Sequence, residues 1–333
     1  MRPPIPDRLR GAAVLRFAGP CARLHGRPSA MVLARTNDAC LEAFSPSKRL
    51  RFLYADVSET ARRLSAAHGL SAPAARLFGK ALAGLGLLGV DVGEDDEILC
   101  FDADLQGPLG GFHLERDGSG HMRGHVFETR PETLLPPGGE VTDSALCGRA
   151  ARVKITRVQD GGGAIRSQMS FAVEPATPDV VLTAFFNNAI PTRVVLSATE
   201  WDGEPDRVRA LALQRLPGAE DKDFDRVASL FADGTVADQL AFDATLATMR
   251  DVLDLWDLKT GPTRALAFGC SCSARRVLAS FAERPAAELR ALAAAGRPVP
   301  FRCHLCGRDY TVGPSTLATL ARRRTQTKKE DKK

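Results

Sequence analysis

Phe268-Gly-Cys-Ser-Cys272 and, after thirty intervening residues, Cys303-His-Leu-Cys306 decide how the last part of this chain folds. Two close cysteine pairs separated by a folded segment can bring four thiolates to one tetrahedral Zn²⁺. Four sulfur ligands leave no position for a catalytic water, so we expect a closed structural site. The predicted ligands are Cys270, Cys272, Cys303 and Cys306. His304 could replace one of them, but four thiols already complete the ligand set, and we expect it to be a bystander.

The spacing of the first pair favours redox chemistry. With one residue between Cys270 and Cys272, the two sulfurs lie close, and a local disulfide competes directly with a metal ion. Thiolates bind zinc and disulfides do not, so oxidation would eject the metal. Structural zinc supplies on the order of 10–16 kcal/mol of apparent binding energy, on which so small a module depends for folding. A purely structural zinc site that never cycles remains the alternative.

These residues resemble the heat-shock protein 33 family of redox-regulated chaperones. The resemblance is strongest in Phe268–Val277 and Cys303–Tyr310, and it extends upstream over about 51–310. The upstream landmarks are His68-Gly-Leu-Ser71, Gly107-Pro-Leu-Gly110, Arg123-Gly-His-Val126 and Leu213-Gln-Arg-Leu-Pro-Gly-Ala219.

The resemblance implies a holdase chaperone that works without ATP. We expect no enzyme, because the sequence has no G-x-S-x-G, H-E-x-x-H or P-loop motif and no convergent acid–base set. In the family, the reduced protein is a zinc-bound, largely inactive monomer. Oxidants such as peroxide or hypochlorite, together with unfolding stress, form two disulfides and release zinc; the zinc domain and linker then unfold, and the active form dimerises. Carried over, the four cysteines are the zinc ligands, and the disulfides are Cys270–Cys272 and Cys303–Cys306. The implied partners are unfolded or partly folded client proteins.

Strand and helix patterns predict an α+β N-terminal core of antiparallel hairpins with packed helices. Alternating apolar residues flank turn sequences at Asp117–Gly120, Gly161–Gly163 and Asp202-Gly203. Hairpins interspersed with helices favour this class over a parallel doubly wound sheet. We expect an N-terminal extension at 1–47, a core domain at 48–218, a helical linker at 219–262, a zinc-binding redox-switch domain at 263–316 and a basic tail at 317–333.

The linker is acidic and amphipathic. Residues 220–257 hold ten acids against three basic residues. Apolar residues recur at spacings of 4, 3, 4 and 3, which predicts one helical stripe: Phe242, Leu246, Met249, Leu253 and Trp256. Such a stripe packs as an ordinary surface helix, or it docks reversibly and binds unfolded clients when released. Periodicity does not separate these alternatives.

Positive charge gathers at both ends of the chain. Residues 1–37 carry seven Arg and one Asp, and residues 322–333 carry seven Lys or Arg and two acids, so the body is negative although the whole chain is +5. We expect both ends to be flexible arms. The first 47 residues could also be an organellar transit peptide, or follow from a start placed before Met31. Few cysteines and no long apolar run predict a reducing, cytoplasmic setting and no membrane partner.

Two other sequence motifs are best explained by ordinary structural roles. Gly84-Leu-Gly-Leu-Leu-Gly89 has the spacing of a dinucleotide-binding loop, but a helical pattern precedes it, so we expect close helix packing instead. His121 and His125 share a strand face, where hydrogen-bonded surface residues are more common than a metal site. The rival functional class is a zinc-stabilised nucleic-acid-binding module using the basic tail; the acidic body argues against it, and no nucleic acid is expected.

Overall fold

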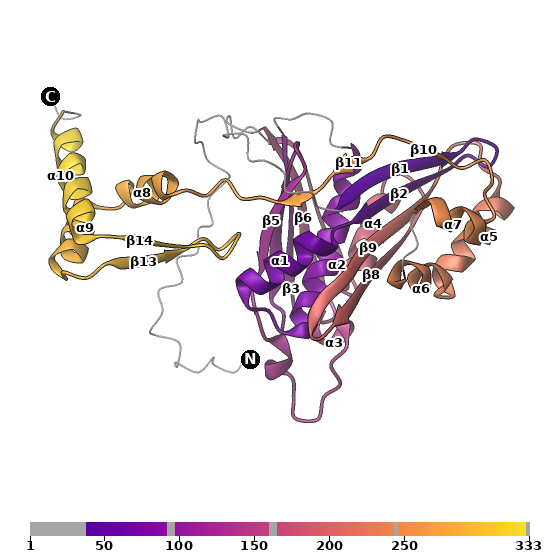
Figure 1. Ribbon diagram of the computed structural model, residues 1–333, viewed down its shortest axis with the longest axis horizontal. Coiled ribbons are helices and arrows are strands. Elements are labelled where there is room, and N and C mark those ends of the chain that lie inside the picture. The colour runs from indigo at the N-terminus through magenta and orange to yellow at the C-terminus, as the bar shows by residue number, and fades with distance from the viewer. Residues whose placement is uncertain (1–37, 92–96, 160–164, 243–245, 331–333) are drawn as a thin grey trace.

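The computed structural model describes residues 38–91, 97–159, 165–242 and 246–330 (Figure 1). Within these ranges the chain forms a core of two large sheets and helices, a helical cover on one sheet, and a small C-terminal module. The predicted α+β class is confirmed, because every pairing in the core except one is antiparallel.

The first sheet has the strand order β10-β1-β2-β9-β8, with β11 also paired to β1. Its strands are β1 (Ala39–Ser45), β2 (Leu50–Asp56), β8 (Thr192–Trp201), β9 (Glu204–Arg215), β10 (Lys259–Thr260) and β11 (Arg264–Ala265). The second sheet has the order β12-β5-β4-β3-β6-β7, in which β12 lies parallel to β5. Its strands are β3 (Glu97–Leu105), β4 (Gly111–Asp117), β5 (His121–Val126), β6 (Ala151–Gln159), β7 (Ile165–Val173) and β12 (Ala267–Phe268).

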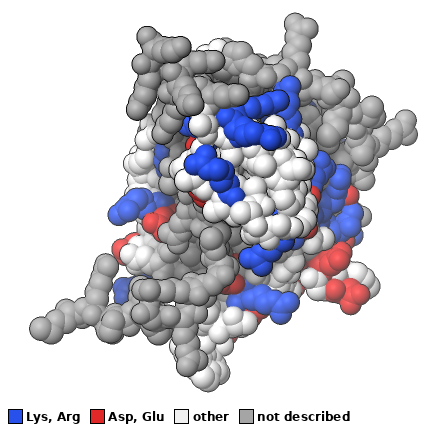
Figure 2. All heavy atoms as spheres, turned by 90° about the vertical axis from the view of Figure 1, so that its left-hand side faces the viewer, with Lys and Arg blue, Asp and Glu red and all other residues white. Residues whose placement is uncertain are grey.

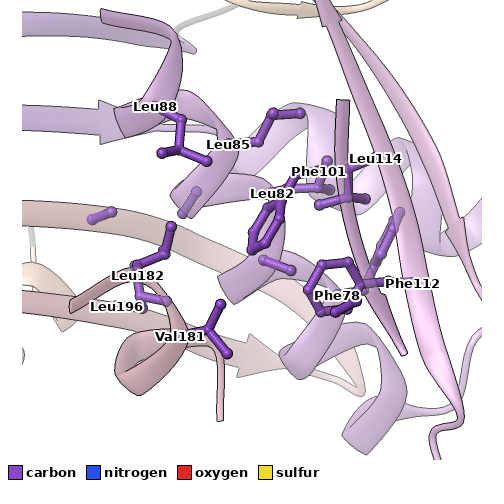
Figure 3. Close-up of a cluster of buried hydrophobic side chains, with 14 of the residues drawn as sticks. Phe78, Leu82, Leu85, Leu88, Phe101, Phe112, Leu114, Val181, Leu182 and Leu196 are labelled. Atoms are coloured by element: carbon purple, nitrogen blue, oxygen red, sulfur yellow. The ribbon is translucent and has the colours of Figure 1, made fainter. Parts of the chain in front are cut away.

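Helices fill the space between the two sheets. Side chains of α2 converge there with those of both sheets and of α4 (Figure 3). The core helices are α1 (Ser58–His68), α2 (Ala72–Leu88) with a 3₁₀ turn at Gly89–Asp91, and α4 (Pro178–Asn187). A second 3₁₀ turn (Pro131–Leu134) and α3 (Asp143–Cys147) lie in the connections. Cys40, Cys100 and Cys147 are buried, as expected of single cysteines, whereas Cys21 lies outside the described residues.

The glycines of the dinucleotide-like motif serve packing, as expected. Gly84 and Gly86 lie inside α2 and are buried. A β-carbon on Gly84 would lie 2.2 Å from Leu182 Cδ1, and one on Gly86 would lie 2.8 Å from the β-carbon of Ala55. The absent side chains therefore let α2 approach α4 on one side and β2 on the other.

Gly86→Ala should destabilise the core by about 1–3 kcal/mol, because the β-carbon of Ala55 is fixed to the sheet and cannot rotate away. Thermal unfolding followed by circular dichroism measures this as a lowered Tm. Gly313→Ala is the matched control, since a β-carbon on Gly313 would have nothing within 4 Å of it. Equal Tm values for the two variants would contradict the packing role.

The first sheet is buried on both faces. Leu53 and Ala55 of β2 point into the main core, whereas Leu50, Phe52 and Tyr54 point outward into a second apolar cluster. The helices that cover this outer face are α5 (Asp221–Ala232), α6 (Thr235–Ala241) and α7 (Leu246–Leu253). The acidic segment is therefore a three-helix cover rather than one continuous helix.

The predicted stripe is divided by these helix ends. Met249 and Leu253 are fully buried in the second cluster, whereas Phe242 follows α6 and is 70% exposed. Trp256 lies beyond α7 and is 68% exposed. The side chain of Leu246 lies outside the described residues. The single-stripe geometry is wrong because α6 ends at Ala241 and α7 ends at Leu253, so Phe242 and Trp256 lie outside both helices.

Two expected boundaries also need correction. Residues 39–45 are not an extension but strand β1, whose pairing with β2 could not be seen from local pattern. Just before it, buried Asp38 accepts the N–H groups of Glu59 (2.9 Å) and Thr60 (2.7 Å) and so caps α1. The expected flexible tail begins instead as helix α10 (Pro314–Glu330), which is anchored by buried Leu317.

The C-terminal module is built from α8 (Ala274–Ala282), α9 (Ala286–Ala294), the hairpin of β13 (Val299–Arg302) and β14 (Asp309–Val312), and α10. Its own core is small, with six buried residues: Val277, Phe281, Leu289, Val312, Leu317 and Ala321. Lys and Arg side chains are prominent on the face that this module turns outward (Figure 2). So small a core indicates that another interaction stabilises the module.

Candidate metal centre

The structure brings the four predicted cysteines together. One sulfur from each of Cys270, Cys272, Cys303 and Cys306 lies within 4.8 Å of every other. The Sγ atoms of Cys270 and Cys303 are 4.0 Å apart, and those of Cys272 and Cys306 are 3.4 Å apart. Four sulfurs around a tetrahedral zinc ion, each about 2.3 Å from it, would be separated by about 3.8 Å. The donor set and its spacing therefore fit one metal ion. In the described part of the chain, no other cluster of potential ligands meets this test.

Two loops present the four thiols. Cys270 and Cys272 lie between β12 and α8, where the Ser273 hydroxyl caps α8 by accepting the N–H of Arg276 (3.3 Å). Cys303 and Cys306 lie in the turn of the β13–β14 hairpin. There the Cys303 N–H donates to Arg308 O, and the Gly307 N–H donates to Cys303 O, both at 2.8 Å. Tight local turns thus aim each pair at the same point.

The thiols are in an environment that cannot hold four negative charges without a cation. Burial raises the pKa of Cys306 to about 12. The pKa of Cys272 is lowered instead, chiefly by hydrogen bonding from Cys270, and the Tyr310 hydroxyl also donates to its sulfur (3.1 Å). One thiolate is therefore favoured, and further ionisation needs a cation among the sulfurs.

The hairpin that carries the second cysteine pair rests on the core domain. The Leu305 carbonyl accepts the N–H of Gly124 in β5 (3.0 Å), and an Arg302 guanidinium donates to Ala67 O at the end of α1 (2.5 Å). Gly307 has φ +70°, and a β-carbon there would lie 2.4 Å from the same Ala67 oxygen. Only a residue without a side chain allows this approach.

A network of charged side chains on β3, β4 and β5 contacts the first ligand loop. Arg123 bonds the Glu115 carboxylate (2.6 Å) and donates to the Ser271 hydroxyl (2.8 Å), between two of the cysteines. His113 bonds Asp102 (2.5 Å) and Glu115 (3.0 Å) through its two ring nitrogens. Sequence reasoning did not single out Arg123 or Ser271. Their only local signal was the presence of Arg123 in a family landmark and of Ser271 between two ligands.

His121 and His125, which the sequence places on one strand face, make contacts typical of structural residues. His121 contacts Asp117 (3.2 Å), and the His125 ring packs between His113, Phe127 and His304. Among the described residues, neither belongs to a group of three or more potential ligands whose donor atoms are close enough to share a metal ion. Burial, then the nearby His304 and His113, lower the pKa of His125 to about 3. His304 points its ring at His125, with centroids 5.1 Å apart.

The His113 network predicts a pH-dependent stability. Burial opposes its charge, but the bonds to Asp102 and Glu115 outweigh burial and raise the pKa of His113 to about 10. Since this pKa lies above the unfolded value of about 6.5, the stabilisation is complete below pH 6.5 and is lost as pH rises through 10. His113→Gln should therefore lower Tm most at pH 6, and its difference from the parent should shrink as the pH rises toward 10.

His121→Gln is the control, because His121 contacts a single carboxylate. The Tm of the zinc-saturated parent and of both variants is measured by thermal unfolding at pH 6 to 10. A difference between His113→Gln and the parent that stays constant over this range would contradict the assignment.

Comparison with known proteins agrees with this architecture. The family model described as Hsp33 protein matches residues 38–313. The 33 kDa chaperonin of Deinococcus radiodurans is 27% identical over 281 residues, covering 81% of this chain and 94% of that protein. The one from Thermus thermophilus is 24% identical over 283 residues, covering 81% and 83%. The crystal structure of the 33 kDa chaperonin from Thermotoga maritima has a TM-score of 0.71 at 16% identity and covers 86% of this chain and 99% of that one.

The fold and the site define a class of protein in which a four-thiol module is docked on an α+β core with a helical cover. Within that class, the chain belongs to the Hsp33 family, because the family match spans most of its length and includes both cysteine pairs. Its relatives are named as chaperonins, not as enzymes. Among the helices that the structure describes, none combines the length and the apolar character needed to cross a bilayer.

Proposed function

We propose that this chain is a redox-regulated, ATP-independent holdase chaperone. The observation that carries the proposal is the closeness of four thiols in a module with too small a core to fold well alone. Zinc suits a set of four sulfur donors, and when bound it would supply folding energy. Cys270, Cys272, Cys303 and Cys306 would hold it.

Oxidation would remove these donors. For each pair, two thiols and one hydrogen peroxide give one disulfide and two water molecules, so sulfur is oxidised and peroxide is reduced. We propose Cys270–Cys272 and Cys303–Cys306 as the pairs. All four sulfurs are mutually close, so this pairing rests on the family resemblance. A reducing compartment such as the cytoplasm would keep the thiols reduced until stress.

In the switch that we propose, the helical cover formed by α5–α7 is the element that undocks. Helices α5–α7 bury Leu50, Phe52, Leu211 and Leu213 on the outer face of the first sheet. Their attachment has a polar rim, which includes Lys48–Asp223 (3.1 Å) and Ser45 Oγ to Asp257 (2.7 Å). Undocking would expose both this sheet face and apolar side chains of the cover, and such surfaces bind unfolded proteins. We propose that this oxidised form dimerises, whereas the reduced form is a monomer.

The direct test measures zinc and chaperone activity together. We expect one zinc per reduced chain, detected with a chromophoric chelator. Peroxide at raised temperature should release it, and suppression of aggregation of a denatured client should appear only then. Retained zinc, with client protection absent or unchanged, would contradict the proposal.

Cysteine variants assign the site in the same assay. Cys272→Ser should lose most bound zinc because one of four sulfur donors is gone. Cys147→Ala is the matched control, since Cys147 is a buried single cysteine in α3 and should leave zinc binding unchanged.

The cover is tested separately from the metal. Met249→Ser and Leu253→Ser each put a hydroxyl into a fully buried apolar position, which should cost about 2–5 kcal/mol of docking. We expect client holding at a lower oxidant dose, with zinc stoichiometry unchanged.

Phe242→Ser and Trp256→Ser are the matched controls, because both side chains are exposed in the docked state. If all four variants share the parent's activation threshold, α7 is ordinary core packing and not part of the switch.

A further inference from the structure

The edge of β5 is occupied by a segment of the chain itself. The extended residues 264–269, which we name the strap, run from β1 to the first ligand loop. The Ala267 N–H donates to Gly120 O, and the Gly269 N–H donates to Met122 O, both at 3.1 Å. The strap thus adds a parallel strand to the second sheet at β5.

The strap also inserts side chains beside this edge. Leu266 is fully buried in the main core, and Phe268, two residues on, packs against it and lies under the Arg63 guanidinium, 4.9 Å from the ring centre. Both are held by an extended backbone that places alternate residues on one face. The strap therefore has the recognition pattern of an extended apolar-x-apolar ligand: main-chain bonds to an edge and two side-chain anchors.

Residues beside the predicted metal ligands cover the same edge. Gly269 precedes Cys270, and Leu305, whose carbonyl accepts the Gly124 N–H of β5, lies between Cys303 and Cys306. One edge of β5 is therefore covered by residues adjacent to both ligand pairs. If the module unfolds, the edge loses these partners, and an uncovered strand edge with free main-chain groups binds other chains.

We propose that the edge of β5, uncovered when the strap leaves, captures extended apolar-x-apolar segments of unfolded proteins by strand addition. The strap is then an internal ligand that blocks the site in the reduced state. This inference rests on the proposed function, because oxidation and zinc release are what would free the edge of β5. It adds the kind of client segment that this edge binds.

A peptide with the sequence of residues 263–269, Thr-Arg-Ala-Leu-Ala-Phe-Gly, is the probe. It contains no cysteine, carries a fluorophore, and is titrated with the full-length chain while anisotropy is recorded. We expect the oxidised, zinc-free chain to bind at least about tenfold more tightly than the reduced, zinc-bound chain.

Methylated peptides test the main-chain bonds. Methyl groups on the nitrogens of the residues equivalent to Ala267 and Gly269 remove both donors to β5 and should weaken binding about tenfold or more. Methylation at the position of Phe268 is the matched control, because successive N–H groups of a strand point in opposite directions and this one points away from β5. Equal affinities for the two methylated peptides would overturn strand addition.

Strap variants separate this inference from the redox proposal. Phe268→Ala removes one anchor, and Leu266→Ser removes the other; either should let the reduced, zinc-bound chain bind the probe. Lys259→Ser is the control, since Lys259 is exposed and pairs with β1 instead. Leu266→Ser also loosens the main core. If Leu266→Ser fails to fold, Phe268→Ala decides the outcome.

The outcomes are distinct. If oxidised chain prevents aggregation but binds no probe, the inference is wrong and the proposed function stands. If Phe268→Ala binds the probe although oxidation never releases zinc, the inference stands without its trigger. If affinity for the probe falls as the oxidised chain becomes more concentrated, β5 pairs with a second copy, and client capture at this edge is overturned.

Discussion

The mutual approach of four sulfur atoms is the constraint on which the C-terminal module of this protein depends. Without it, the module has six buried apolar side chains, a two-stranded hairpin and three helices. Conformational entropy opposes the ordering of every residue in it, and a core of that size offsets little of this cost. A metal among the thiols would hold two distant loops at one point. In the function we propose, the same four atoms are the ones oxidised, so stability and redox sensitivity would depend on one site.

The module contacts the rest of the chain through main-chain and side-chain hydrogen bonds. Its ligand loops touch the N-terminal core at β5 and at the end of α1, and its strap continues toward the edge of β1 and then α7. One short stretch of extended chain therefore links the thiols to both sheets and to the helical cover, and it is the route by which the switch we propose would act (Figure 1). Such coupling does not require a rigid connection between the elements. When one docked element leaves, its neighbour loses the contacts that held it.

The two apolar faces of the first sheet would let the helical cover undock, as we propose, without loss of the core fold. Strands β2 and β9 alternate between two apolar clusters, so the inner face keeps its contacts with α1 and α2 when the outer face is uncovered. Leu53 and Ala212 hold the main core, whereas Phe52 and Leu213 lie under the cover. An outer face this apolar would be an aggregation liability if it were permanently exposed. Its acidic cover keeps the surface charged as well as closed.

Local pattern was enough to predict the hairpins, the helical character of residues 220–257 and the four-cysteine set, because strand alternation, helix periodicity and cysteine spacing are short-range properties. It could not predict that residues 39–45 form a strand, that Asp38 caps a helix far along the chain, or that the apolar stripe is cut at Phe242 and Trp256. Nor could it place Arg123 against Ser271 or Leu305 against Gly124. These features depend on strand pairing and docking between segments far apart in the chain. The sequence by itself determined which atoms could bind a metal; only the tertiary structure decided what the binding of those atoms holds in place, because long-range contacts leave no periodic trace in the residues that make them.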